Sequence, residues 1–202
     1  MIMEQKLIEN EEKEILDLYR SVGALLEGHF VLSSGLHSKI YLQSALIFSR
    51  PDIAKIICSK LVKKIIEKVN IKEINYIVSP AMGGVLLGYE VSRQTGLPNI
   101  FVERVDSVFN IRRGFKITKG SRVLVVEDIV TTGKSSLECF KCIKESGGEV
   151  VAEAALINRG GDVDLGVPLI SLANINIPNY DANSLPEELK QIEAIKPGSR
   201  PI

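Results

Sequence analysis

Apolar residues recur with two different periods along this chain, and the periods predict its helices and strands. Residues 11–22 carry apolar side chains three or four positions apart, which predicts an amphipathic helix that ends at Gly23. A four-residue repeat predicts a second helix that begins near Pro51 and reaches about residue 69. The apolar positions are Ile15, Leu18, Tyr19 and Val22 in the first helix, and Ile53, Ile57, Leu61 and Ile65 in the second.

The apolar pattern also predicts a hairpin and a sheet. Residues 30–32 and 40–42 are short apolar pieces on either side of a polar segment that contains Gly35, which is typical of a β-hairpin. From residue 74 onward, strand-length apolar runs alternate with helical segments, which predicts an α/β fold with a central parallel sheet flanked by helices. The strands are expected at residues 74–78, 100–102, 123–126 and 150–157, and the helices at residues 85–95 and 135–145.

A polar segment, residues 103–120, interrupts this alternation. Because it is longer than the usual connection, it is predicted to be either a hairpin with an exposed tip or a functional loop. The chain contains no internal repeat, no low-complexity tract and no linker-like boundary. Residues 1–202 are therefore expected to form a single domain.

The composition excludes several classes of protein. Hydrophobic residues make up 45% of the chain, which is enough to bury a core and argues against disorder. Lys and Arg together number 25, as do Asp and Glu, and the zero net charge argues against a nucleic-acid partner. No apolar run approaches the roughly 18 residues that span a bilayer, so no membrane partner is expected. Three cysteines and an N-terminus without a secretory signal favour the cytoplasm.

The most informative stretch is residues 123–136. A buried apolar strand leads into two adjacent carboxylates, Glu127 and Asp128, and then into a loop of Thr, Gly and Ser that opens a helix. In open α/β sheets, ligands bind at the carboxyl ends of the strands, and the N–H groups at a helix N-terminus bind phosphate. This stretch therefore predicts a site for a monophosphate beside two acids.

Two other phosphate-binding loops fail on spacing. Gly133-Lys134-Ser135 matches the end of a Walker A loop, but the glycine that should come first would stand at position 128, which is Asp128. The glycine-rich residues 83–88 follow a predicted strand, but their spacing is not G-x-G-x-x-G, which disfavours a dinucleotide-binding fold.

The acidic pair and the Thr131-Thr132-Gly133 loop resemble the phosphoribosyl diphosphate (PRPP) motif of type I phosphoribosyltransferases, and residues 79–84 resemble their pyrophosphate loop. The resemblance implies that Glu127 and Asp128 hold the ribose hydroxyls and that residues 131–135 wrap the 5′-phosphate. The residues expected to bind PRPP are Ala81, Met82, Gly83, Glu127, Asp128, Ile129, Val130, Thr131, Thr132, Gly133, Lys134 and Ser135.

Further segments resemble the orotate branch of this family. They are residues 23–30, 34–38 and 41–43, Arg112-Arg113-Gly114 and Asn158-Arg159-Gly160-Gly161. The resemblance implies a small N-terminal hood, formed mainly by residues 1–50 with the C-terminal segment. It also implies that Arg159 meets the orotate carboxylate, with Thr131 and Tyr41 as further orotate contacts.

The resemblance implies a Mg²⁺-dependent transfer of the phosphoribosyl group from PRPP to orotate. Mg²⁺ is expected to be held by substrate oxygens and water, as this hard cation prefers, so no protein metal motif is expected. Residues 103–115 are expected to form a mobile lid that reaches the site of a neighbouring subunit, which implies a homodimer. The catalytic candidates are Arg104, Arg112 and Arg113, which would neutralise pyrophosphate, and Asp128.

Two alternatives stay open. The first is a phosphoribosyltransferase for another purine or pyrimidine base, although a purine has no carboxylate for Arg159 to meet. The second is a regulator that binds PRPP without catalysis, because many orotate-specific members carry lysines and a histidine in the lid, whereas this lid has only three arginines. Cys139 and Cys142 have C-x-x-C spacing but no second cysteine pair, so they are expected to pack in the core rather than bind metal.

Overall fold

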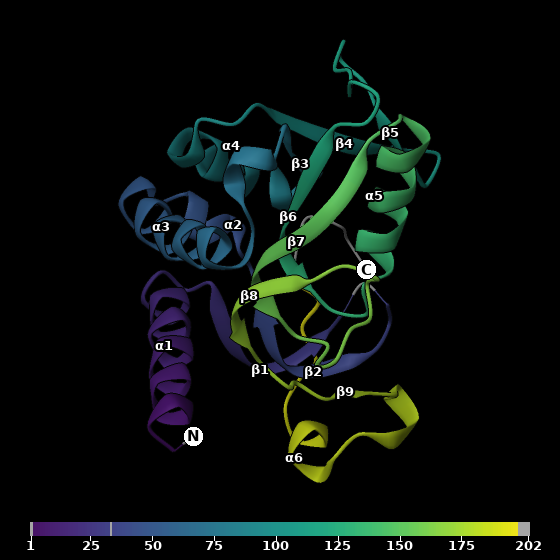
Figure 1. Cartoon of the computed structure of the whole chain (residues 1–202). Helices are drawn as coiled ribbons and strands as arrows, with labels where there is room; N and C mark the ends of the chain where they lie inside the picture. The colour runs from purple at the N-terminus through teal and green to yellow at the C-terminus, as the bar shows by residue number, and fades with distance from the viewer. Residues whose placement is uncertain (1, 33, 198–202) are drawn as a thin grey trace.

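The computed structural model describes residues 2–32 and 34–197, which form two β-sheets and the helices around them (Figure 1). The strands of the larger sheet are β3 (Tyr76–Pro80), β4 (Asn99–Val105), β5 (Val108–Ile111), β6 (Arg122–Val130), β7 (Glu149–Asn158) and β8 (Leu169–Asn174). Their spatial order is β5-β4-β3-β6-β7-β8, and all pairs are parallel except β4 with β5. The predicted α/β fold with a central parallel sheet is confirmed.

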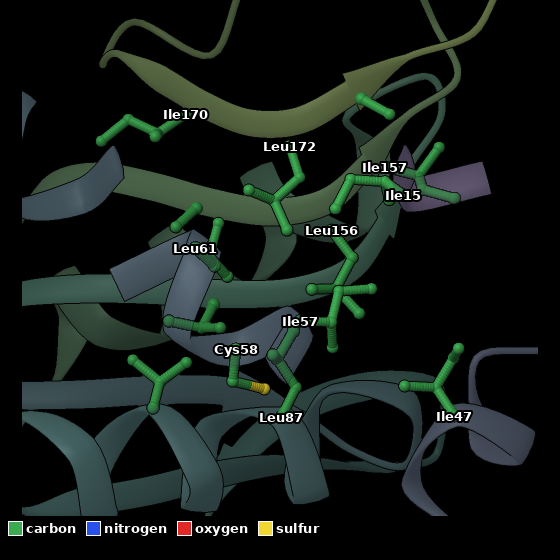
Figure 2. Packing of buried hydrophobic residues seen from close by; sticks show 14 of the residues in the cluster. Ile15, Ile47, Ile57, Cys58, Leu61, Leu87, Leu156, Ile157, Ile170 and Leu172 are labelled. Atoms are coloured by element: carbon green, nitrogen blue, oxygen red, sulfur yellow. The ribbon is translucent and has the colours of Figure 1, made fainter. Parts of the chain in front are cut away.

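Helices cover both faces of this sheet. They are α1 (Ile2–Ser21), α2 (Ala45–Phe48), α3 (Pro51–Lys68), α4 (Gly83–Thr95) and α5 (Lys134–Glu145). Successive side chains of β6 point to opposite faces, so Leu124 and Val126 join the core formed with α1, α3 and α4, whereas Val123 and Val125 pack with α5. Figure 2 shows the first of these cores, which contains Ile57 of α3.

The predicted helices on either side of the hairpin are present. The first ends two residues before Gly23, which has a positive φ of 70°, and the second has Pro51 as its first residue. Gly96 ends α4 in the left-handed conformation, with a φ of 76°. None of the helices built by the described residues combines the length and the apolar content needed to cross a lipid bilayer.

A smaller three-stranded sheet joins the two ends of the chain. Its strands are β1 (Leu25–Val31), β2 (His37–Leu42) and β9 (Asn179–Tyr180), in the order β1-β2-β9, and all pairs are antiparallel. Two short helices follow β9: the 3₁₀ helix η2 (Ala182–Ser184) and α6 (Glu187–Lys190). We call these strands and α6 the hood. The predicted β-hairpin is confirmed, with both strands longer than expected.

The polar segment 103–120 contains a hairpin. Strand β4 continues to Val105, a two-residue turn follows, and β5 runs back along β4. The turn residues Asp106 and Ser107 have φ angles of 49° and 67°, as the tight turns that suit twisted hairpins require. Of the two predictions for this segment, the hairpin is therefore correct for its first part.

Strand β6 differs from its predicted extent. It reaches Val130, four residues beyond the apolar run, because β7 pairs with it as far as Val130 with Asn158. Glu127 and Asp128 thus lie inside the paired strand rather than after it. The apolar pattern also failed to predict β8, β9, α2, α6 and the 3₁₀ helix η1 (Ile71–Glu73).

Candidate active site

Three loops meet where the neighbouring strands β3, β6 and β7 end. A Cβ atom added to Gly83, after β3, would lie 2.6 Å from Oδ1 of Asp128 on β6. A Cβ atom added to Gly160, after β7, would lie 1.7 Å from the carbonyl oxygen of Thr131. Only glycine permits such close approaches. The predicted pyrophosphate loop, acidic pair and phosphate loop are therefore in contact at one edge of the sheet, as ligand sites of open α/β sheets are.

The phosphate loop opens α5. Thr131, Thr132, Lys134 and Ser135 are exposed, and Gly133 is buried with a positive φ of 74°. Ile129 and Val130 lie before this loop, at the end of β6. The exposed hydroxyls and the N–H groups at the start of α5 are donors suited to a phosphate.

The pyrophosphate loop joins β3 to α4. The Ala81 N–H donates to the Val102 carbonyl oxygen at 2.7 Å, which ties the loop to β4. The Ala81–Met82 peptide bond is cis, and the Met82 side chain is 83% exposed. Gly83 then begins α4 and carries the contact with Asp128.

The acidic pair consists of one buried and one partly exposed carboxyl group. Glu127 is 7% exposed, and its Oε2 atom has no hydrogen-bond partner within the described part of the chain. Burial, and next the charge of Asp128, raise the pKa of Glu127 well above its ordinary value. Burial also raises the pKa of Asp128, although hydrogen bonds with Glu127 and Ser44 oppose that shift. Both acids therefore hold a proton more readily than a carboxyl group in water does.

A further carboxyl group, Glu153 on β7, lies in the protein interior. It is fully buried, it accepts a hydrogen bond at 2.9 Å from Ser136 in the first turn of α5, and its Oε2 atom is unpartnered within residues 9–32 and 34–197. Burial raises its pKa from 4.5 to about 7, against the effect of the Ser136 hydrogen bond. Glu153 thus holds the first turn of α5, directly after the phosphate loop, and its burial favours the neutral acid.

Stability is expected to fall as the pH rises through the pKa of Glu153. The pKa of Glu153 is higher in the folded protein than in the unfolded chain. Its contribution to the free energy of unfolding is therefore complete below pH 4.5 and is lost by about pH 7. The loss is about 3 kcal/mol. Urea denaturation should therefore give the Glu153→Gln variant a free energy of unfolding close to that of the parent at pH 5. At pH 8 the free energy of unfolding of the variant should exceed that of the parent by about 3 kcal/mol.

The matched control is Glu149→Gln, which changes an exposed carboxyl group on the same strand. This variant should follow the pH dependence of the parent protein. If the stability of the Glu153→Gln variant fell with pH as much as that of the parent, Glu153 would not be the titrating group.

Arg159 stands at the end of β7 beside the phosphate loop. Its backbone N–H donates to the Val130 carbonyl oxygen at 2.7 Å. Its Nη2 atom donates to Ser38 Oγ on β2 at 2.7 Å and to Asn179 Oδ1 on β9 at 2.8 Å. Two residues of the hood therefore aim this side chain. Burial lowers the pKa of the guanidinium, and its buried Nε atom has no hydrogen-bond partner among the described residues.

A pocket of about 280 Å³ lies next to this guanidinium. The residues that line it are Thr131, Thr132, Arg159, Gly160, Asp162, Val163, Asp164 and Asn179. The pocket thus combines the first residues of the phosphate loop with Arg159. Within the described part of the chain, Arg159 forms no ion pair with a carboxylate. An anionic ligand with a phosphate at one end and a second acidic group suits this pocket.

The sequence relationships agree with this geometry. The family model of the phosphoribosyl transferase domain matches residues 50–165. The orotate phosphoribosyltransferase of Caulobacter vibrioides is 50% identical over 188 residues, which are 93% of this chain and 96% of that protein. The enzyme of the same name from Maricaulis maris is 51% identical over the same shares. The chain belongs to the orotate phosphoribosyltransferase family.

Solved structures show the same fold. The orotate phosphoribosyltransferase of Aeropyrum pernix superposes with a TM-score of 0.68 at 23% identity, over 78% of this chain and 92% of that one. The adenine phosphoribosyltransferase of Leishmania tarentolae also matches, with a TM-score of 0.54 at 20% identity, over 67% and 77% of the two chains. Because phosphoribosyltransferases for different bases share this fold, the base must be argued from the site residues.

The lid arginines are not part of the cluster formed by the three loops in this chain. Arg104 lies over the Phe109 ring, with its guanidinium carbon 4.0 Å from the ring centroid, and pairs with Glu138 on α5 at 2.6 Å. Arg112 and Arg113 both pair with Glu103, at 3.7 and 2.9 Å. Their contact with pyrophosphate stays a prediction. It requires either that these ion pairs open or that the arginines reach the site of a second subunit.

Sequence reasoning missed the hood residues that touch the site. Tyr41 was predicted to contact orotate, but its described neighbours are the Phe30 ring, with centroids 5.8 Å apart, and Gln43, which donates to its hydroxyl at 3.3 Å. Ser38 of the same strand reaches Arg159 instead, so the orotate contact of Tyr41 stays a prediction. Asn179 lies in a segment whose apolar residues show no period. Only a family motif that included the residues of β9 could have identified it.

Proposed function

We propose that this chain catalyses the reaction of orotate with PRPP to give orotidine 5′-monophosphate and pyrophosphate, a step of pyrimidine nucleotide synthesis. The observation that carries the choice of base is Arg159, a half-buried guanidinium beside the phosphate loop. Its neighbours Ser38 and Asn179 are neutral. A cation withdrawn from water is stabilised by an anionic partner, and the orotate carboxylate supplies one. Purines and uracil carry no such group.

In the proposed reaction, the bond between ribose C1 and the pyrophosphate oxygen breaks as N1 of deprotonated orotate bonds to C1. Pyrophosphate leaves with the electron pair of the broken bond. Because N1 has already lost its proton to solvent, no proton is removed from orotate in this step. The protein therefore acts mainly by positioning the two reactants and by stabilising the charge that develops on the ribose and on the leaving group. Asp128 and Glu127 would accept hydrogen bonds from the ribose hydroxyls, and residues 131–135 would hold the 5′-phosphate.

Magnesium is part of this proposal. Within the described residues, no three His, Cys, Asp or Glu side chains gather as a metal-binding group. The donors at the site are the oxygens of Asp128 and Glu127, which suit a hard cation that reaches the site with its substrate and water ligands. When bound, Mg²⁺ supplies positive charge next to the leaving pyrophosphate, and Asp128 would hold it through its water shell.

A homodimer is also proposed. Three large apolar residues lie at helical spacing, Met82 directly before α4 and Leu86 and Tyr89 within it, and they are 83%, 53% and 60% exposed. Contiguous exposed apolar side chains favour a protein contact, and this face adjoins the pyrophosphate loop. A second copy seated here would cover it. We place the enzyme in the cytoplasm, in keeping with three buried free thiols.

The role of the lid arginines can be tested by substitution. If Arg112 and Arg113 neutralise the leaving pyrophosphate, each change to alanine should lower kcat/KM by about 10-fold to 100-fold, because each removes a charge-assisted contact. Lys116→Ala, an exposed cation in the same segment, serves as the control and should change little. Unchanged kcat/KM in both arginine variants would remove this role.

The function itself is tested with PRPP, Mg²⁺ and a set of bases. Pyrophosphate release is expected with orotate and not with uracil, hypoxanthine or adenine. Orotate and uracil form a matched pair, since they share the ring and differ by the carboxylate. Turnover of a purine without turnover of orotate would reverse the assignment, and tight PRPP binding without turnover of any base would favour a regulator.

A further inference from the structure

The loop that carries Arg159 is held by the side chain that precedes it. Asn158, the last residue of β7, is 6% exposed. Its Oδ1 atom accepts a hydrogen bond from the Gly160 N–H at 3.0 Å, and its Nδ2 atom donates to the Gly161 carbonyl oxygen at 2.8 Å. The Arg159 N–H donates to the Val130 carbonyl oxygen at 2.7 Å. Each of the three residues after β7 therefore has a backbone group fixed by a hydrogen bond.

Asn174, the last residue of β8, decides which way the Asn158 amide faces. The two asparagines are register partners, and Asn158 Nδ2 also donates to Asn174 Oδ1 at 3.2 Å. The Ser171 hydroxyl donates to the same oxygen at 2.9 Å. The backbone N–H and the Nδ2 atom of Asn174 both donate to Glu12 Oε1 on α1, at 2.9 and 3.1 Å. Because a carboxylate only accepts hydrogen bonds, Asn174 must turn Nδ2 to Glu12 and Oδ1 to Asn158.

The orientation of Asn174 in turn fixes the orientation of Asn158. The nitrogen of the Asn158 amide must face the acceptor Asn174 Oδ1, so its oxygen faces the Gly160 N–H. Both hydrogens and the oxygen of this buried amide are then partnered, as buried polar groups require. An aspartate in this place could keep only the bond with Gly160. The network therefore requires an amide, and shape alone does not suffice.

The loop fixed in this way lines the pocket beside the phosphate loop. Arg159 and Gly160 both belong to the lining of that pocket. Two hood residues bind the guanidinium at the far end of the Arg159 side chain. Asn158 fixes the backbone from which the same side chain starts. The direction of the guanidinium thus depends on Asn158 as much as on the hood.

We propose that Asn158 is a positioning residue, whose side-chain amide holds the backbone of residues 159–161 so that the Arg159 guanidinium faces the carboxylate of orotate. This inference deepens the proposed function and rests on it, because it takes orotate as the ligand of Arg159. The role of Asn158 does not require contact with substrate.

The test measures both KM values in variants that remove the donors of Asn158. Asn158→Asp keeps the shape and the acceptor for the Gly160 N–H, but it places a carboxylate against two acceptor oxygens. Its KM for orotate should rise about 10-fold to 100-fold, as expected for two lost hydrogen bonds, and its KM for PRPP by less than about threefold. Asn158→Ser keeps an acceptor without adding a charge and should raise the KM for orotate about 3-fold to 10-fold.

A double variant separates positioning from a general loss of stability. If Asn158 acts through the guanidinium, adding Asn158→Asp to Arg159→Ala should raise the KM for orotate no further. The matched control is Asn70→Asp, at the exposed start of η1. Asn70 Oδ1 likewise accepts from the N–H two residues on, that of Lys72, at 3.3 Å, and its Nδ2 atom donates to Glu73 Oε1 at 2.8 Å. Both KM values of this variant should equal those of the parent.

Three results would overturn the inference. The first is that Asn158→Asp lowers the melting temperature but leaves the KM for orotate unchanged. The second is an equal rise in the KM for PRPP, and the third is that the effects of Asn158→Asp and Arg159→Ala add independently. The serine variant decides the question if the aspartate variant does not fold. If the parent protein releases no pyrophosphate from PRPP and orotate, the proposed function fails instead.

Discussion

Replacing Arg159 with alanine is expected to raise the KM for orotate by about 100-fold, because a guanidinium–carboxylate contact withdrawn from water is worth about 3 kcal/mol. The KM for PRPP should change far less, since the phosphate loop and the acidic pair stay in place. Steady-state kinetics with each substrate varied in turn separates the two constants. This result would show that Arg159 binds the carboxylate of orotate.

Two further variants make this result specific. Arg159→Lys keeps the positive charge but loses the fork of donors, so its KM for orotate should lie between those of the parent and the alanine variant. Arg93→Ala removes an exposed arginine that pairs with Glu90 on α4 and should change neither constant. An equal rise in both KM values for Arg159→Ala would mean that the residue holds the hood and the loops together without recognising orotate.

Replacing Gly160 with alanine is expected to lower kcat/KM by at least about 100-fold. The new methyl group would lie 1.7 Å from the Thr131 carbonyl oxygen, so the two loops must separate. A displacement of about 1 Å in a positioned group can cost about 100-fold in rate. Because the phosphate loop itself moves, titration should also show weaker binding of PRPP, which distinguishes this variant from Arg159→Ala.

Gly166→Ala is the control for the backbone. Gly166 belongs to the same connection between β7 and β8 and has a positive φ of 70°, but no atom lies within 4 Å of its added Cβ. This variant should lose about 1 kcal/mol of stability through backbone strain and retain its kcat/KM. If both glycine variants lost activity equally, loop strain rather than the Gly160–Thr131 contact would explain the effect.

The elements proposed to bind ribose and phosphate could be placed from the sequence because they are consecutive in it. Strand β6, its two acids, the hydroxyl-rich loop and α5 are consecutive, and each carries its own signal: an apolar run, adjacent carboxylates, small residues and a helical period. The contacts of the lid arginines could not be predicted in this way. Their partners Glu103 and Glu138 are set by the pairing of β4 with β5 and by the packing of α5, which no local pattern encodes.

The part of the site proposed to bind orotate depends on segments far apart in the chain. Ser38 and Asn179, which aim Arg159, come from strands that precede and follow the main sheet, and β9 is only two residues long. So short a strand has no period to detect. The sequence identifies Tyr19 as an apolar-face position of its helix, but only the fold places its hydroxyl against Ser44.

By itself, the sequence determined the parallel sheet, the order of its helices and the loops at the strand ends, because periodicity and turn residues act over neighbouring positions. The tertiary structure alone decided which of those loops touch, how the hood aims Arg159, and why the pKa values of Glu127, Asp128 and Glu153 are raised. Those properties depend on burial and on partners distant in sequence, and both arise only when the chain packs.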